Sequence, residues 1–178
     1  MAKAGKNKHK AEPRPLLGLL AGLVAGLAAS AAMEAFQGAA GKAADAGKSD
    51  AEKQREQAQQ DDAATVKAAN KAALAVTGDE VPDEYREPAG RAVHYVTGAV
   101  LGAIYGVITE YQPRAASGFG GAYGFATSLV LDEAAVPAAG LSEAPWKAPL
   151  SSHGFGLASH MAYGVALEGV RTLLGGRR

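Results

Sequence analysis

Acidic side chains and histidines lie at or near the ends of the long uncharged stretches of this 178-residue sequence. Carboxylates that lie close together compete for protons, and a neutral imidazole can accept a proton or bind a divalent metal ion. If the fold brings such groups together, they can pass protons or hold a cation. The residue types therefore predict a proton or ion relay, whose candidate members are Glu34, His94, Asp132, Glu133, His153 and His160.

The same residues also have a simpler interpretation as hydrogen-bonded helix ends, and the sequence favours it. His160 follows His153 by two helical turns on one face, where it either fixes helix packing by a hydrogen bond or extends a proton path toward Glu168. The spacing of the histidines and acids matches no metal-binding motif, so no metal site is predicted.

Catalytic motifs are scarce. The sequence has no cysteine, which excludes thiolate nucleophiles, thiolate metal sites and disulfides. Ser151, Ser152, His153 and Asp132 have the residue types of a hydrolase triad, but no Gly-x-Ser-x-Gly turn accompanies them. The glycine clusters lie inside apolar stretches, unlike those of phosphate-binding loops. We therefore predict a protein that is not an enzyme and uses no cofactor.

Four stretches without charge must position these residues, and each is long enough for a membrane-spanning helix. At ~1.5 Å rise per residue, each stretch would measure roughly 25–30 Å, which is close to the thickness of the bilayer core. We predict an all-α protein built as a four-transmembrane-helix bundle. The predicted segments are a basic cytoplasmic tail (1–14), transmembrane helices (15–36, 90–112, 115–136 and 149–172), a charged extramembrane insert (37–89), an outer loop (137–148) and a second basic cytoplasmic tail (173–178).

Two alternatives fit parts of this pattern. A soluble alanine-rich bundle would also contain apolar helices, but such helices normally keep a charged stripe, which these stretches lack. The basic start and the first apolar stretch also resemble a secretory signal peptide. That stretch is long for a signal peptide and shares its glycine spacing with the later ones, which favours a retained helix.

The insert differs from the rest of the chain in its many charged and amide side chains. Ser49 and Glu52 have capping-box spacing, and Gly78 is a typical C-terminal stop, so we expect one helix at about 50–77. Its larger apolar residues, Val66, Leu74 and Val76, all lie in its second half. The segment from Asp79 to Pro88 is expected to be irregular, and the insert as a whole is interpreted as a solvated spacer.

The distribution of lysine and arginine predicts the orientation. The short terminal segments and the connection at Arg114 are basic, whereas the insert is rich in acids. The positive-inside rule then places both termini in the cytoplasm and the insert outside. In this orientation the two acids near the inner surface have arginines at helical spacing, because Arg114 follows Glu110 by four residues and Arg171 follows Glu168 by three.

Small residues recur every four positions in all four stretches, and an acid ends each series. Residues four apart share one helix face, so each helix offers a groove of small side chains that lets another backbone approach closely. This pattern predicts tight packing between helices. The predicted packing glycines are Gly18, Gly22, Gly26, Gly98, Gly102, Gly106, Gly120, Gly124, Gly156 and Gly164.

The last half of the chain carries a family resemblance. The segments GRAVHYVTGAVLGAIYGVITE (90–110), GFGGAYGFATSLVLDEAAVPAAGLSEAP and SSHGFGLASHMAYGVALEGVR resemble the YagU-like family of small bacterial inner-membrane proteins of uncharacterised function. The first helix, with Met33 and Glu34, matches more loosely, and the insert matches least. The resemblance implies a multispan inner-membrane protein and no established reaction.

Packing features outnumber catalytic ones in this sequence. We therefore expect a non-enzymatic, structural or stress-linked protein of the bacterial inner membrane that acts through helix packing and partners. The alternative is a proton- or ion-coupled transporter or channel for small solutes, which would work as a homo-oligomer. The expected partners are the lipid bilayer and further copies of the chain. Nucleic acid is not expected, because the formal net charge is +0.

Overall fold

The computed structural model describes residues 12–59 and 63–176. Every regular element in these ranges is helical, which confirms the predicted all-α class. Most of the basic tail predicted at 1–14, residues 60–62 of the helix predicted at 50–77, and residues 177–178 lie outside the described residues.

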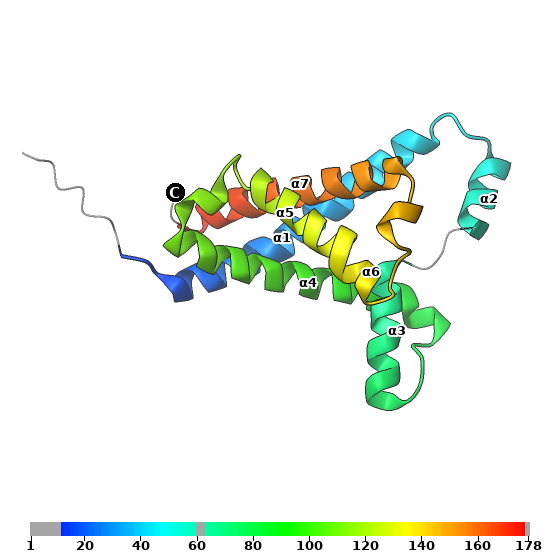
Figure 1. Ribbon diagram of the computed structural model, residues 1–178, viewed down its shortest axis with the longest axis horizontal. Helices are drawn as coiled ribbons and strands as arrows, with labels where there is room; N and C mark the ends of the chain where they lie inside the picture. Colours follow the sequence, from blue (N-terminus) through cyan, green and yellow to red (C-terminus); the bar gives the residue numbers. More distant parts are fainter. Residues whose placement is uncertain (1–11, 60–62, 177–178) are drawn as a thin grey trace, which may run out of the picture.

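The helices form an elongated bundle with the insert at one end (Figure 1). The long helices of the bundle are α1, α4 and α7, and a shorter helical segment made of α5, η2 and α6 completes it. The bounds are α1 (Pro15–Asp45), α2 (Asp50–Gln59), α3 (Ala64–Thr77), α4 (Asp83–Tyr111), η1 (Pro113–Ala116), α5 (Gly121–Val130), η2 (Leu131–Ala135), α6 (Val136–Ala138), η3 (Pro145–Lys147) and α7 (Leu150–Leu173).

Consecutive segments of the bundle run in opposite directions. Along the interface of α1 with α4, Gly18 faces Gly106 and Gly26 faces Gly98, so the two helices are antiparallel. At the end of the bundle away from the insert, the Arg14 guanidinium donates to the Gly175 carbonyl oxygen at 2.9 Å. This bond places the start of α1 beside the end of α7. The chain therefore passes along the bundle four times, as the four uncharged stretches predict.

The burial pattern of α1 is the reverse of that in a soluble helix. Its buried residues are mainly glycine and alanine, together with Ser30 and Met33. Its leucines lie outside, and Leu16, Leu20 and Val24 are all at least half exposed. A soluble bundle would bury these large aliphatic side chains.

Two of the described helices, α1 and α4, are long and apolar enough to cross a membrane. The other two predicted spans, α5 and α7, do not meet these criteria of length and hydropathy. Helix α5 has 10 residues and continues into a π-helical turn that carries Asp132 and Glu133. Helix α7 has 24 residues but contains His153, His160 and several serines, which lower its hydropathy.

The helix predicted from residue 115 begins only at Gly121. Residues 113–116 form a 3₁₀ turn, and Gly118, Phe119 and Gly120 then have positive φ angles of 63°, 53° and 82°. Three successive residues with this geometry cannot continue a right-handed helix. In contrast, α4 begins at Asp83, so the irregular connection expected from Asp79 to Pro88 is wrong over its second half. The first turn of α4 carries two acids, which favour a helix N-terminus.

The insert keeps its predicted caps but is not one helix. The Glu52 carboxylate accepts from the Ser49 N–H at 2.8 Å and from its hydroxyl at 2.7 Å, and these bonds lower the pKa of Glu52. Gly78 ends α3 in the left-handed conformation. Between α2 and α3, however, Ala63 has an extended backbone with ψ of 145°.

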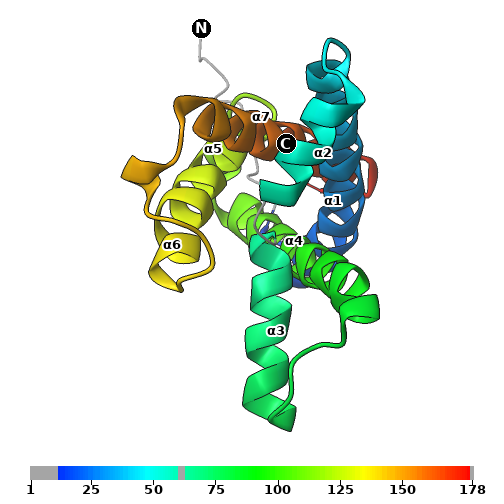
Figure 2. The same cartoon turned by 90° about the vertical axis from the view of Figure 1, so that its right-hand side faces the viewer.

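Docking of α3 on α4 explains the break. Val66 approaches Gly90 so closely that a Cβ on Gly90 would lie 2.6 Å from Val66 Cγ2. This contact fixes the direction of α3, so tertiary packing overrides the local helix preference. Helix α3 consequently projects from the end of the bundle (Figure 2). Of its larger apolar residues, Val76 is 85% exposed rather than buried.

Candidate functional site

A cavity of about 630 Å³ lies among the helices at the insert end of the bundle. Its walls come from the second half of α1, the first half of α4, η2 and the middle of α7, and the first residues of α3 contribute a further wall. Four of the predicted relay residues line it, namely Glu34, His94, Asp132 and His160. The fold thus brings together residues that are distant in sequence, one from each segment of the bundle.

Asp132 and His160 form the central pair of this cavity. Nδ1 of His160 lies 3.1 Å from Oδ2 of Asp132 and 3.1 Å from the Gly156 carbonyl oxygen. The Ser128 hydroxyl donates to the same Asp132 oxygen at 2.9 Å. Asp132 belongs to the π-helical turn η2, and such turns often occur at functional sites. Oδ2 of Asp132 therefore accepts one hydrogen bond, from Ser128, and it lies within ion-pair distance of the His160 ring.

Glu34, which also lines the cavity, pairs with Arg91 and Tyr95 of α4. Its carboxylate lies 3.2 Å from Nε of Arg91 and accepts a hydrogen bond from the Tyr95 hydroxyl at 2.9 Å. Arg91 also contacts Glu87 at 3.2 Å. The Arg91 guanidinium is thus shared by the Glu34 and Glu87 carboxylates. All three side chains are exposed or half-exposed.

His94 and Ser30 lie deeper, where α1 crosses α4. Nε2 of His94 lies 3.3 Å from the Ser30 carbonyl oxygen. The Ser30 hydroxyl is fully buried and, within the described part of the chain, makes no hydrogen bond. Tyr163 of α7 closes this region by donating its hydroxyl to the Gly98 carbonyl oxygen at 2.6 Å. Ser30, Tyr163 and the residues of α3 were not predicted as part of a site.

His153 and Glu133, the remaining predicted relay residues, lie apart from the described cavity lining and contact each other. Nδ1 of His153 is 2.6 Å from the Glu133 carboxylate, and Nε2 is 3.0 Å from the Pro145 carbonyl oxygen. Both ring nitrogens therefore face acceptors, which is the arrangement that a protonated imidazole satisfies. This pair ties the start of α7 to η2 and to the loop before it.

The predicted packing glycines account for the close contacts of the bundle. On α1 and α4, Gly18, Gly22 and Gly26 face Gly106, Gly102 and Gly98, and their backbones touch. On α5 and α7, a Cβ on Gly164 would lie 2.9 Å from the Gly124 nitrogen, and one on Gly120 would lie 2.8 Å from the Gly164 carbonyl carbon. Gly156 differs from the others, because a Cβ placed on it would lie 3.0 Å from Oδ2 of Asp132 rather than close to a backbone atom.

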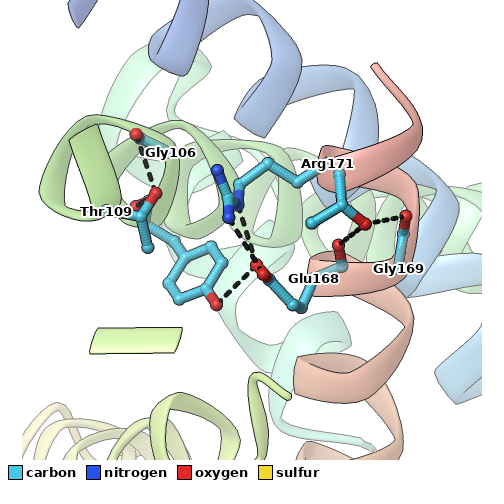
Figure 3. A network of polar contacts seen from close by, with 7 residues as sticks. Gly106, Thr109, Glu168, Gly169 and Arg171 are labelled. Carbon is cyan, nitrogen blue, oxygen red and sulfur yellow. Dashed lines mark hydrogen bonds and ion pairs between the residues drawn. The ribbon is translucent and has the colours of Figure 1, made fainter. Parts of the chain in front are cut away.

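A second polar cluster lies at the opposite end of the bundle, around Arg171 (Figure 3). The Glu168 carboxylate accepts from Nε of Arg171 at 2.8 Å and from its Nη2 at 2.9 Å, and the Tyr105 hydroxyl donates to it at 2.9 Å. The Arg171 guanidinium carbon also lies 5.7 Å from the centre of the Tyr105 ring. The predicted pairing of Glu168 with Arg171 is confirmed, but the pair is buried inside the bundle rather than exposed at a surface.

Glu110 has a different partner from the one predicted. Helix α4 ends at Tyr111, so Arg114 lies beyond it in η1, where the helical four-residue spacing no longer applies. The buried Glu110 carboxylate instead accepts from the Arg14 backbone N–H at 2.8 Å. This contact joins the start of α1 to the end of α4.

The two polar clusters differ in what they can do. The Arg171 cluster is packed by protein on all sides and pairs its charges internally. The cavity instead offers carboxylates and imidazoles beside open space. Among the described residues, no three histidine or acidic side chains come close enough together to hold a metal ion. The cavity is therefore the place where a small molecule could bind.

Comparisons of the whole chain with protein-family models, curated proteins and solved structures gave no match.

Proposed function

We propose that this chain is a multi-pass protein of the bacterial inner membrane, with four helical segments spanning the bilayer. The observation that carries the proposal is the reversed burial pattern. Large aliphatic side chains cover the outside of the bundle, whereas glycine, serine and even a Glu–Arg pair fill its interior. Lipid accepts such an exterior, and close packing of small residues then holds the helices together. The resemblance to the YagU-like family agrees with this proposal.

The reversed pattern extends to the two segments of lower hydropathy. Helix α5 exposes Phe125 and Leu129 while it buries Gly124 and Ser128. Helix α7 exposes Met161 and Val165 while it buries Ser159, His160, Glu168 and Arg171. Because all four segments turn their apolar side outward at the same depth of one bundle, we propose that they cross the membrane together.

Reporter fusions test this topology. A periplasm-specific reporter inserted at Gly47, in the turn after α1, should be active, and the same reporter fused after Arg178 should be inactive. A cytoplasm-specific reporter should give the reverse result. This pattern follows from an even number of spans with the basic termini inside. Activity of the periplasmic reporter at the C-terminus would exclude the proposed four-span arrangement.

We further propose that the protein binds a small solute in the cavity and couples its movement to protons. The convergence of Glu34, His94, Asp132 and His160 supports this function over a purely structural one, because structural helix ends need not share a cavity. Asp132 and His160 are the proton-exchanging pair of the proposal, since His160 Nδ1 lies 3.1 Å from Asp132 Oδ2 and both residues line the cavity. Four helices are few for a complete solute path, so transport would involve a homo-oligomer.

Proton flux into liposomes tests whether protons pass through the cavity. Purified protein is reconstituted with an entrapped pH-sensitive dye, and a potassium gradient with valinomycin supplies the driving force. We expect flux above that of empty liposomes, and we expect Asp132→Asn to lose most of it. Glu133→Gln is the matched control, because Glu133 neighbours Asp132 in the same turn but contacts His153 away from the cavity.

Equal flux in Asp132→Asn and in the parent, or no flux in the parent, would contradict a proton path through Asp132. The structural role expected from the sequence would then be the better proposal.

A further inference from the structure

We infer that the cavity selects a small organic cation, of the size and character of an alkylated ammonium ion. This inference rests on the proposed solute-binding function and names the class of solute. It follows from the charge of the cavity wall, from the apolar surface that surrounds the charges, and from the size of the cavity.

The cavity wall carries more negative than positive charge. Its acidic side chains are Glu34, Glu87 and Asp132, and Arg91 is the one lysine or arginine in the described lining. Arg91 is already shared by Glu34 and Glu87. Asp132 accepts a hydrogen bond from the Ser128 hydroxyl and lies beside the His160 ring, and within the described residues no lysine or arginine pairs with it. Its charge can therefore attract a cation that enters the cavity.

The remainder of the wall favours an organic cation over an inorganic one. Between the charged groups lie apolar side chains, including Met33, Val93, Leu101 and Leu131. A divalent metal needs several oxygen or nitrogen ligands converging at about 2–2.6 Å, and the described residues contain no such group of acids and histidines. A cation that carries its own methyl or methylene groups fits this surface, because those groups replace water against the apolar wall.

The size of the cavity agrees with this class. A volume of about 630 Å³ falls in the range of small-molecule sites, which is roughly 300–1,000 Å³.

Choline and its uncharged isostere 3,3-dimethylbutan-1-ol provide a direct test, because they share shape and hydroxyl and differ in charge. Binding to the full-length protein in detergent is measured by isothermal titration calorimetry. We expect choline to bind at least roughly tenfold more tightly than the isostere. Asp132→Asn should remove this preference, and Glu133→Gln should keep it.

A second variant guards against misfolding of Asp132→Asn. Val93→Trp fills the cavity without changing its charge and should abolish choline binding while the melting temperature stays near that of the parent. Equal affinity for the two probes, or choline binding that survives both Asp132→Asn and Val93→Trp, would overturn the inference. Asp132-dependent proton flux without choline binding would leave the proposed function in place and refute only the cation class, whereas choline binding without flux would refute only the coupling.

Discussion

Gly102→Leu should insert into the membrane normally and yet lower the stability of the purified protein. A Cβ on Gly102 would lie 2.7 Å from the Gly26 Cα and 2.9 Å from the Gly26 nitrogen. These are backbone atoms of α1, which cannot move without shifting the whole helix. Overpacking of this kind destabilises by about 1–3 kcal/mol or more, whereas leucine improves apolarity and helix propensity. The measurements are the membrane-inserted fraction and the melting temperature in detergent.

Gly38→Leu is the matched control for this experiment. Gly38 also lies within α1, but nothing lies within 4 Å of a Cβ placed on it. The same substitution there should leave the melting temperature unchanged or raise it slightly. If Gly102→Leu melted at the temperature of the parent, close packing of α1 on α4 would not hold the bundle together.

The interface of α1 with α4 could be predicted because small residues leave a regular trace in the sequence. A four-residue repeat marks one face of a helix, and such a face of small residues predicts close packing against another helix, although all four stretches carry the repeat and it does not say which helices pair. The structure pairs Gly22 with Gly102 in this way. The same repeat places Ser30 and Glu34 at the end of the α1 series, where the cavity begins.

The cavity could not be predicted from the same trace, because it depends on features without a periodic signal. Asp132 faces His160 from a π-helical turn, which shifts its direction relative to an ordinary helix. Helix α3 reaches the cavity because it docks on α4, where Val66 packs against Gly90. The insert looks like a solvated spacer in sequence, since alanine dominates its apolar residues.

The complete burial of Arg171 could not be predicted from the sequence either, and the reason is physical. Three-residue spacing from Glu168 indicates an ion pair but carries no information on burial. In the structure the Arg171 side chain is 0% exposed, and Tyr105 of α4 supplies both a hydrogen bond to Glu168 and an aromatic ring beside the guanidinium. The tyrosine lies more than sixty residues away in the sequence, so only the fold reveals this cluster.

Arg171→Met should be among the most destabilising single changes in this protein. It leaves the buried Glu168 carboxylate without the guanidinium that lies 2.8 Å from it. Removing one member of a buried pair typically costs about 3–5 kcal/mol, because the remaining charge is uncompensated. Glu168→Met should have a similar effect for the same reason. Unfolding of each variant is followed by circular dichroism in detergent, with Asp83→Asn as a control, since Asp83 pairs with Arg86 while 92% exposed.

The double variant Glu168→Met with Arg171→Met tests whether the two side chains stabilise the protein as a charge pair or independently of each other. A buried pair and an apolar pair of similar volume often give similar stability, because the attraction between the charges mainly offsets their desolvation. We therefore expect the double variant to be more stable than either single variant. If its loss instead equalled the sum of the two single losses, the side chains would contribute independently. This end of the bundle would then be held by its glycine contacts and not by charge pairing.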